Sequence, residues 1–116
     1  MINIDNKNER LVIASVLGEF TLADFEEIEK AFEFAVRFQG KASLLLDLTD
    51  MLGFTLDVAW EEIQFTRQYA HDFEKIAIVT DDQWVQWSAW LPRNLTDAEF
   101  EVFQEYDAAL AWISQE

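Results

Sequence analysis

The side chains that could carry acid–base or metal chemistry are 23 carboxylates and one histidine, and the chain has no cysteine. The missing cysteine excludes a disulfide, a thiolate nucleophile and a cysteine-based metal site. His71 is the only histidine, which excludes a metal site built from several histidines, and no Ser-His-Asp set is recognisable around it. It stands beside Asp72, between a predicted helix and a predicted strand, where a solvated loop histidine is the common case. We therefore predict no catalytic residue, no metal site and no cofactor.

Asp47 stands at the end of a buried apolar run, where a carboxylate can accept a phosphoryl group. Such an aspartate occurs in the receiver domains of response regulators, which hold Mg²⁺ with a neighbouring acidic pair. The supporting residues are missing here, because the first strands end without an acidic pair and the residue directly before Pro92 is Leu91 and not a lysine. We interpret Asp47, Asp50 and Asp57 as cap and turn residues.

Thr55 precedes a predicted helix, and its hydroxyl is expected to accept from the free N–H groups of the first turn. A phosphate at Thr55 would also suit a helix N-terminus, but we regard phosphorylation as the weaker interpretation. Three acidic pairs are interpreted as solvated helix faces or as charges that complement a helix dipole. They are Glu26-Glu27, Glu61-Glu62 and Asp81-Asp82.

The chain is rich in aromatic residues, with ten Phe, five Trp and two Tyr. Three tryptophans of one predicted short helix follow each other at intervals of three, so they cannot all point into one narrow core. Phe34 and Phe38 lie off the apolar face of the first predicted helix, and Phe54 is expected in the loop before the second. These rings form either an exposed surface, such as a partner interface or ligand groove, or an aromatic-rich core. The three tryptophans are Trp84, Trp87 and Trp90.

The first half of the chain has the pattern of a hairpin, a long helix and a buried strand. Apolar runs at 1–4 and 11–17 flank turn-forming residues and indicate a β-hairpin. Thr21 and Asp24 have the spacing of a capping box, and apolar residues then recur at helical spacing until Gly40. The continuous apolar run at 43–48 is typical of a central strand covered on both faces.

The second half continues the alternation of helix and strand. The pattern predicts a helix from Thr55 to about Ala70, a strand at 75–79, a short third helix that ends near Pro92, an edge strand at 99–103 and a last helix at 106–113. The order is ββαβαβαβα. It predicts an α/β fold whose mostly parallel sheet has an antiparallel N-terminal strand and is flanked by helices.

Composition and charge restrict the class of protein. The length and the 51% hydrophobic content predict one folded domain over residues 1–116. The formal net charge of −15 and the scattered Lys and Arg residues argue against binding nucleic acid or anionic lipid headgroups, and leave a basic partner open. No signal peptide or membrane span is recognisable, so we expect a cytoplasmic protein.

Several stretches together resemble the SpoIIAA-like STAS (STAS/SEC14-like) family of small bacterial proteins. Each stretch is weak alone, and their order and spacing carry the resemblance. The residues are Gly18, Thr21 and Asp24; 45–48; Trp60 and Phe65; 73–79 with Asp81 and Trp84; Phe103; and 111–113.

The resemblance implies a STAS-like fold and a family without known catalysis. Some members of this family are suspected of binding apolar ligands or membranes. It also implies a comparison with anti-sigma-factor antagonists, which carry a phosphorylatable serine in an Asp-Ser-Ser-Gly-like motif. The corresponding stretch here reads Gly53-Phe54-Thr55-Leu56-Asp57-Val58 and lacks that serine. A phosphoserine switch of this kind is not expected.

Two functional hypotheses remain. The first is a non-enzymatic binding or regulatory module that holds an apolar or lipid-like ligand, or contacts a membrane peripherally, through six aromatic residues. The second is a protein-interaction module, either a homodimer or an anti-sigma-antagonist-like protein, that uses the same surface. The six residues are Phe54, Trp60, Phe65, Trp84, Trp87 and Trp90.

Overall fold

The computed structural model describes residues 2–8, 10–82 and 98–115 of the chain. The main sheet has five strands in the order β1-β2-β4-β6-β7, and a separate pair of strands is formed by β3 and β5. The elements in chain order are β1 Ile2–Asn8, β2 Leu11–Val16, β3 Gly18–Phe20, α1 Leu22–Gln39, β4 Ala42–Asp47, β5 Met51–Phe54, α2 Leu56–Gln68, β6 Phe73–Val79, β7 Glu99–Phe103 and α5 Tyr106–Ile113.

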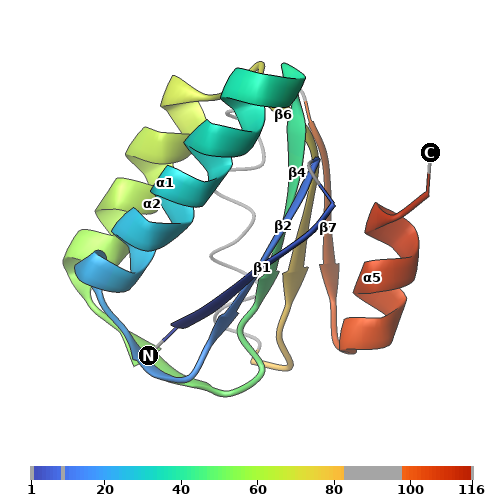
Figure 1. Cartoon of the computed structure of the whole chain (residues 1–116). Helices are drawn as coiled ribbons and strands as arrows, with labels where there is room; N and C mark the ends of the chain where they lie inside the picture. The colour runs from blue at the N-terminus through green and yellow to red at the C-terminus, as the bar shows by residue number, and fades with distance from the viewer. Residues whose placement is uncertain (1, 9, 83–97, 116) are drawn as a thin grey trace.

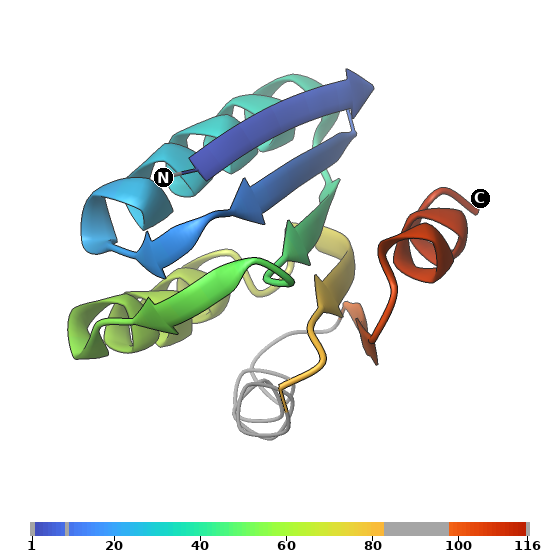
Figure 2. The same ribbon diagram turned by 90° about the horizontal axis from the view of Figure 1, so that it is seen from below.

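The predicted α/β architecture is confirmed. β1 pairs with β2 in antiparallel fashion, and β2, β4, β6 and β7 are parallel to one another. Helices α1 and α2 cover one face of the sheet and α5 covers the other (Figures 1 and 2). The predicted short helix with Trp84, Trp87 and Trp90 lies outside the described residues.

Helix α1 begins and ends where the local sequence predicts. The Thr21 Oγ1 accepts from the Asp24 backbone N–H at 3.3 Å, and the Asp24 carboxylate accepts from the Thr21 N–H at 3.2 Å. This reciprocal pair satisfies two N–H groups that the first turn cannot use internally. At the other end, Gly40 has a φ of 86°, a conformation that a residue with a Cβ rarely adopts.

Strand β4 lies at the centre of the main sheet, which explains its continuous apolar run. Leu44 and Leu46 face the layer of α1 and α2, whereas Leu45 packs in the smaller cluster beneath α5. Successive side chains of a strand point to opposite faces, so covering both faces requires apolar residues throughout.

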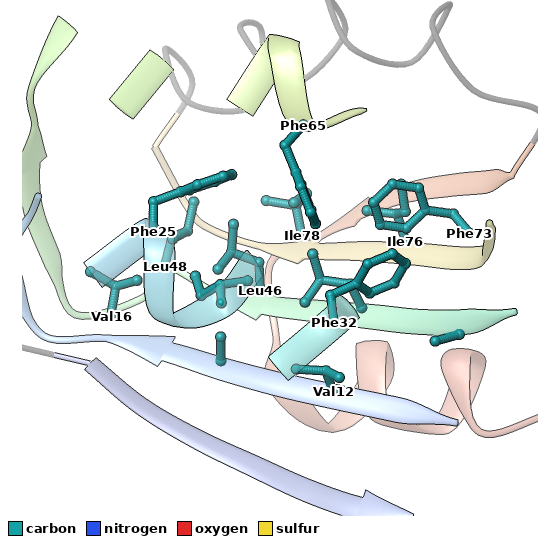
Figure 3. Close-up of a cluster of buried hydrophobic side chains, with 14 of the residues drawn as sticks. Val12, Val16, Phe25, Phe32, Leu46, Leu48, Phe65, Phe73, Ile76 and Ile78 are labelled. Carbon is teal, nitrogen blue, oxygen red and sulfur yellow. The ribbon is translucent and has the colours of Figure 1, made fainter. Parts of the chain in front are cut away.

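The larger core lies between the sheet and the helices α1 and α2, and its centre is aromatic (Figure 3). Phe32 stacks on Phe73 with ring centroids 4.3 Å apart, and its ring meets Phe65 edge-on at 5.4 Å. Phe25 meets Phe65 edge-on at 5.6 Å. The core therefore holds part of the aromatic excess that the composition revealed.

The pair formed by β3 and β5 is a feature that the sequence pattern did not predict. The apolar run at 11–17 is interrupted after Val16, because Gly18, with a φ of 77°, starts a separate strand. The strands β3 and β5 pair in parallel, with Phe20 opposite Phe54, so Phe54 lies in a strand and not in the predicted loop. Pairing between segments more than thirty positions apart leaves no local signature in the sequence.

Helix α5 is attached to the sheet by Lys75 of β6. The Lys75 Nζ donates to the backbone oxygens of Trp112 at 3.2 Å and Gln115 at 2.9 Å, and lies 5.2 Å from the centre of the Trp112 ring. A cation at a helix C-terminus pairs with carbonyl groups that have no partner inside the helix.

Candidate functional site

The most exposed large apolar side chains in the described part of the chain include four that follow one another across β5 and the start of α2. Leu52 is 89% exposed, Phe54 44%, Leu56 88% and Trp60 62%. We call these four residues the junction patch. Where exposed apolar side chains form a contiguous surface, that surface usually marks a contact with a partner or ligand.

The local structure explains why these four side chains are exposed. Leu52 and Phe54 are two positions apart in β5, so both point to the same side of the strand. Leu56 and Trp60 are four positions apart in α2 and lie on one side of the helix, while Val58 between them is buried in the core.

Exposed carboxylates lie next to the junction patch in the chain and on the strand paired with β5. Glu19 is exposed on β3 and pairs in register with Gly53 of β5. Asp50 directly precedes β5 and Asp57 is the second residue of α2, and both are exposed. Residues 42–66 contain no Lys or Arg, so no cation of this segment offsets the acidic field around the patch.

Thr55 stands at the N-cap position of α2, as predicted, but its hydroxyl does not cap the helix. The Thr55 backbone is extended, and its carbonyl accepts from the N–H groups of Val58 and Ala59 at 3.1 and 3.3 Å. Its Oγ1 donates to the Asp57 carboxylate instead. The expectation that this hydroxyl serves the free N–H groups is therefore wrong, because the side chain is turned toward Asp57 and accepts no backbone N–H of α2. A phosphate here would lie beside that carboxylate and be repelled by it.

Asp47 has the turn role that the sequence predicts. Its Oδ1 accepts from the Thr49 N–H at 3.1 Å and from the Thr49 hydroxyl at 2.6 Å. These bonds close a turn between β4 and β5. His71 is exposed in the turn after α2. Within residues 2–8, 10–82 and 98–115, no three or more His, Asp or Glu side chains are grouped in a way that could hold a metal ion.

The aromatic residues predicted to form one binding surface are placed in different environments. Phe54 and Trp60 are exposed in the junction patch, whereas Phe65 is 3% exposed and packs in the core against Phe25 and Phe32. The other three members of the predicted site, Trp84, Trp87 and Trp90, are outside the described residues. Binding of an apolar ligand by this set stays a prediction.

A cluster of carboxylates between α1 and α2 was not recognised from the sequence. Burial and the adjacent Glu61, which shares a hydrogen bond with Glu29, raise the pKa of Glu29 from 4.5 to about 7. One oxygen of Glu29 is buried and has no hydrogen-bond partner. On the same side of α1, Glu33 accepts from the Tyr69 hydroxyl at 2.5 Å.

Further along α2, burial raises the pKa of Glu62 to about 7 as well. The spacing of Glu26, Glu29 and Glu33 along one side of α1 is visible in the sequence. Only the packing of the two helices decides that this side of α1 meets α2. For that reason the sequence pattern led us to interpret the acidic pairs as solvated faces.

None of the helices in the described residues is long and apolar enough to cross a membrane. Among curated proteins, none matches the chain. Solved structures of similar fold include two that cover nearly the whole chain. The first is an uncharacterized protein of the DUF3478 family with a SpoIIAA-like fold from Shewanella loihica PV-4, with a TM-score of 0.74, 22% identity and coverage of 97% of this chain and 92% of that one.

The second similar structure is the anti-sigma factor antagonist SpoIIAA in its unphosphorylated form, with a TM-score of 0.65 and 10% identity over 99% of this chain and 100% of that one. At identities of 22% and 10%, the two structures show a similar fold and nothing further. The profile of the SpoIIAA-like family matches residues 11–114, which is most of the chain. The predicted resemblance is thus confirmed, and the chain belongs to the SpoIIAA-like family.

Proposed function

We propose that this protein is a non-enzymatic interaction module that binds another polypeptide chain through the junction patch. The observation that carries the proposal is the exposure of Leu52, Phe54, Leu56 and Trp60 over one continuous stretch of β5 and α2. Covering such side chains removes apolar surface from water and is favourable at about 25 cal/mol for each Å².

A protein partner agrees with the shape and the chemistry of this surface. The four side chains come from a short strand and the first turns of a helix, and they project outward. The neighbouring carboxylates favour a partner with basic residues at the rim of its own apolar surface. One structure of similar fold belongs to a protein named an anti-sigma factor antagonist, and that name describes action on another protein.

The non-enzymatic part of the proposal rests on the chemistry of the described residues. His71 lies exposed in a turn, and Oδ1 of Asp47 accepts the hydrogen bonds of its own turn. The carboxylates with a raised pKa lie on α1 and α2, where the neighbouring hydroxyls are already engaged: Tyr69 donates to Glu33, and Thr66 donates to the backbone oxygen of Glu62.

The proposal is tested by site-specific photocrosslinking in cells of the native host. A photoreactive phenylalanine analogue replaces Leu52 in one variant and Glu74 of β6, which is exposed outside the patch, in a control variant. We expect one defined protein to be crosslinked at position 52 and not at position 74. A Trp60→Ser change in the first variant should remove that product.

Each outcome of the crosslinking has a meaning. Equal crosslinking from positions 52 and 74, or a pattern that Trp60→Ser does not change, would contradict a docking surface at the junction patch. Crosslinks only to lipids or small molecules, identified by intact mass and organic extraction, would replace the protein partner by the apolar or lipid-like ligand that the sequence suggested.

A further inference from the structure

The short strand β5 is paired along one of its two edges. In the described part of the chain, β3 is the one strand that pairs with β5, and Figure 2 shows the two strands side by side. The register is regular toward the end of the pair, where Glu19 lies opposite Gly53 and Phe20 lies opposite Phe54. We call the edge of β5 that faces away from β3 the outer edge.

The backbone of Phe54 points to the outer edge. The N–H of Thr55 donates to the carbonyl oxygen of Phe20 at 3.4 Å, so the backbone of Thr55 faces β3. In a strand, the N–H and C=O of one residue point to the same edge, and those of the next residue point to the other edge. The N–H and C=O of Phe54 are therefore directed away from β3.

The sequence of β5 has neither the charge nor the proline that often protects an exposed edge. An open edge pairs readily with another chain, and charged side chains or proline hinder that pairing. Strand β5 consists of the residues Met-Leu-Gly-Phe at 51–54. On the other strand of the pair, the middle residue is the exposed Glu19, which carries a charge. Of the two strands, β5 is thus the better template for an added strand.

The side chains beside the outer edge are apolar and exposed. Leu52 is 89% exposed and Phe54 44%. A strand added at this edge places alternate side chains beside these two, at a distance where apolar cross-strand pairs stabilise a sheet. Because β5 has only four residues, the backbone hydrogen bonds to an added strand are few. The side-chain contacts must therefore supply much of the affinity.

Charge near the outer edge selects a basic segment. Glu19, Asp50 and Asp57 are exposed, and residues 42–66 contain no Lys or Arg. Basic residues at the ends of an added segment meet opposite charge at this surface, whereas acidic residues are repelled. Backbone, side chains and charge thus describe one kind of occupant, an extended segment that is apolar at alternate positions and carries Lys or Arg.

We propose that the junction patch binds an extended basic segment of a partner protein, which adds to the outer edge of β5 as a third strand. The inference rests on the proposed function and adds the manner of recognition. The N–H and C=O of Phe54 bind the backbone of the segment, and the side chains of Leu52 and Phe54 select its apolar residues. Addition of a strand to an open edge is a general mode of peptide recognition.

The first experiment selects peptides from a phage-displayed random library on the immobilised full chain. We expect enriched peptides with apolar residues at alternate positions and with Lys or Arg. Leu52→Ser should abolish their binding, whereas Phe34→Ser, which changes an exposed ring of α1 outside the patch, should not. Both altered side chains are exposed, so neither variant disturbs the core. A selection without any peptide that depends on Leu52 would overturn the proposal.

An N-methyl scan of the best peptide tests whether it binds as a strand. Each N-methyl group removes one backbone N–H of the peptide. In an added strand, alternate N–H groups face β5 and the others face solvent. We expect binding to be lost at every second position and kept at the positions between. Similar effects at all positions would show that the peptide binds in another conformation, which would refute strand addition.

Amide hydrogen exchange measured by NMR tests the backbone of Phe54 directly. In the free protein, the Phe54 N–H should exchange faster than the N–H of Thr55, which is bonded to Phe20. At saturating peptide, exchange at Phe54 should slow by roughly tenfold or more, because its N–H gains an acceptor. Slow exchange at Phe54 in the free protein, or no change on binding, would contradict an open edge that accepts a strand.

The failure of this inference is distinguishable from the failure of the proposed function. Photocrosslinking from position 52 that depends on Trp60, together with unchanged exchange at Phe54, would keep the interaction module and reject strand addition. The partner would then contact the patch with a folded surface. Crosslinking that does not differ between positions 52 and 74 contradicts the proposed function itself.

Discussion

At the scale of single residues, Glu29 shows how burial and like charge act together. Its pKa is raised from 4.5 to about 7, so between these values the folded protein holds a proton that the unfolded chain has lost. The contribution of Glu29 to stability is therefore greatest below pH 4.5 and falls as the pH rises to 7. Above pH 7 both states are ionised, and the loss is complete.

Glu29→Gln removes the cost of ionising this buried carboxyl group, because the amide stays neutral at every pH. One pKa unit corresponds to about 1.4 kcal/mol. Solvent near the half-buried Glu29 reduces the full effect, so we expect the free energy of unfolding to rise by roughly 1 to 2 kcal/mol at pH 8. The gain should vanish near pH 4.5. Urea unfolding at both pH values measures it, with the exposed Glu27→Gln as control. An equal gain at both pH values would show that Glu29 acts by something other than its charge.

Phe32 is the residue on which the aromatic core depends most. It is fully buried and contacts the rings of Phe65, Tyr69 and Phe73. Phe32→Ala leaves a cavity and should cost about 3 to 5 kcal/mol in the free energy of unfolding. Phe38→Ala, in the same helix but 65% exposed, should change it by about 0.5 kcal/mol or less. Guanidinium unfolding of the two variants gives the comparison, and similar losses would contradict this assignment of the core.

At the scale of elements, α1 and α2 are each preceded by a threonine, and the two threonine hydroxyls form different hydrogen bonds. The Thr21 hydroxyl accepts from a backbone N–H of α1, whereas the Thr55 hydroxyl donates to Asp57. Thr21→Ala should therefore destabilise the protein by about 1 kcal/mol. Thr55→Ala should cost clearly less, because no helix N–H loses its partner. Thermal unfolding of both variants is the measurement, and a larger loss for Thr55→Ala would contradict the two roles.

The strand pair β3–β5 is the element that creates the junction patch. Pairing with β3 holds β5 extended, so Leu52 and Phe54 point to one side, and α2 begins two residues later. Without this pairing the stretch would be the loop that the sequence pattern suggests. The exposure of these side chains is thus a consequence of backbone hydrogen bonding between distant segments.

At the scale of the whole molecule, net charge opposes compactness. The 23 acidic and 8 basic residues give a self-repulsion that is released on unfolding and screened by salt. We expect the midpoint of thermal unfolding to rise as NaCl increases from 0.01 to 0.3 M, at a protein concentration low enough to keep the chain monomeric. Sucrose at matched osmolality controls for solute effects. A midpoint that falls with salt would mean that specific ion pairs outweigh the general repulsion.

The amino-acid sequence by itself determined the features that depend on neighbours along the chain. The capping box and Gly40 define α1, and the apolar run of β4 predicts a strand covered on both faces. The order of helices and strands then predicts the parallel sheet, because crossover helices require it. Periodicity also placed Phe34 and Phe38 outside the core, since helical geometry is repeated from turn to turn.

Only the tertiary structure decided the features that depend on segments far apart in the chain. It placed Phe65 in the core and left Trp60, five residues before it in the same helix, exposed. It brought Glu29 and Glu61 together and paired β3 with β5. The physical reason is that the pKa of a carboxyl group, the partner of a strand and the exposure of a ring are set by neighbours in space, which a local pattern in the sequence does not contain.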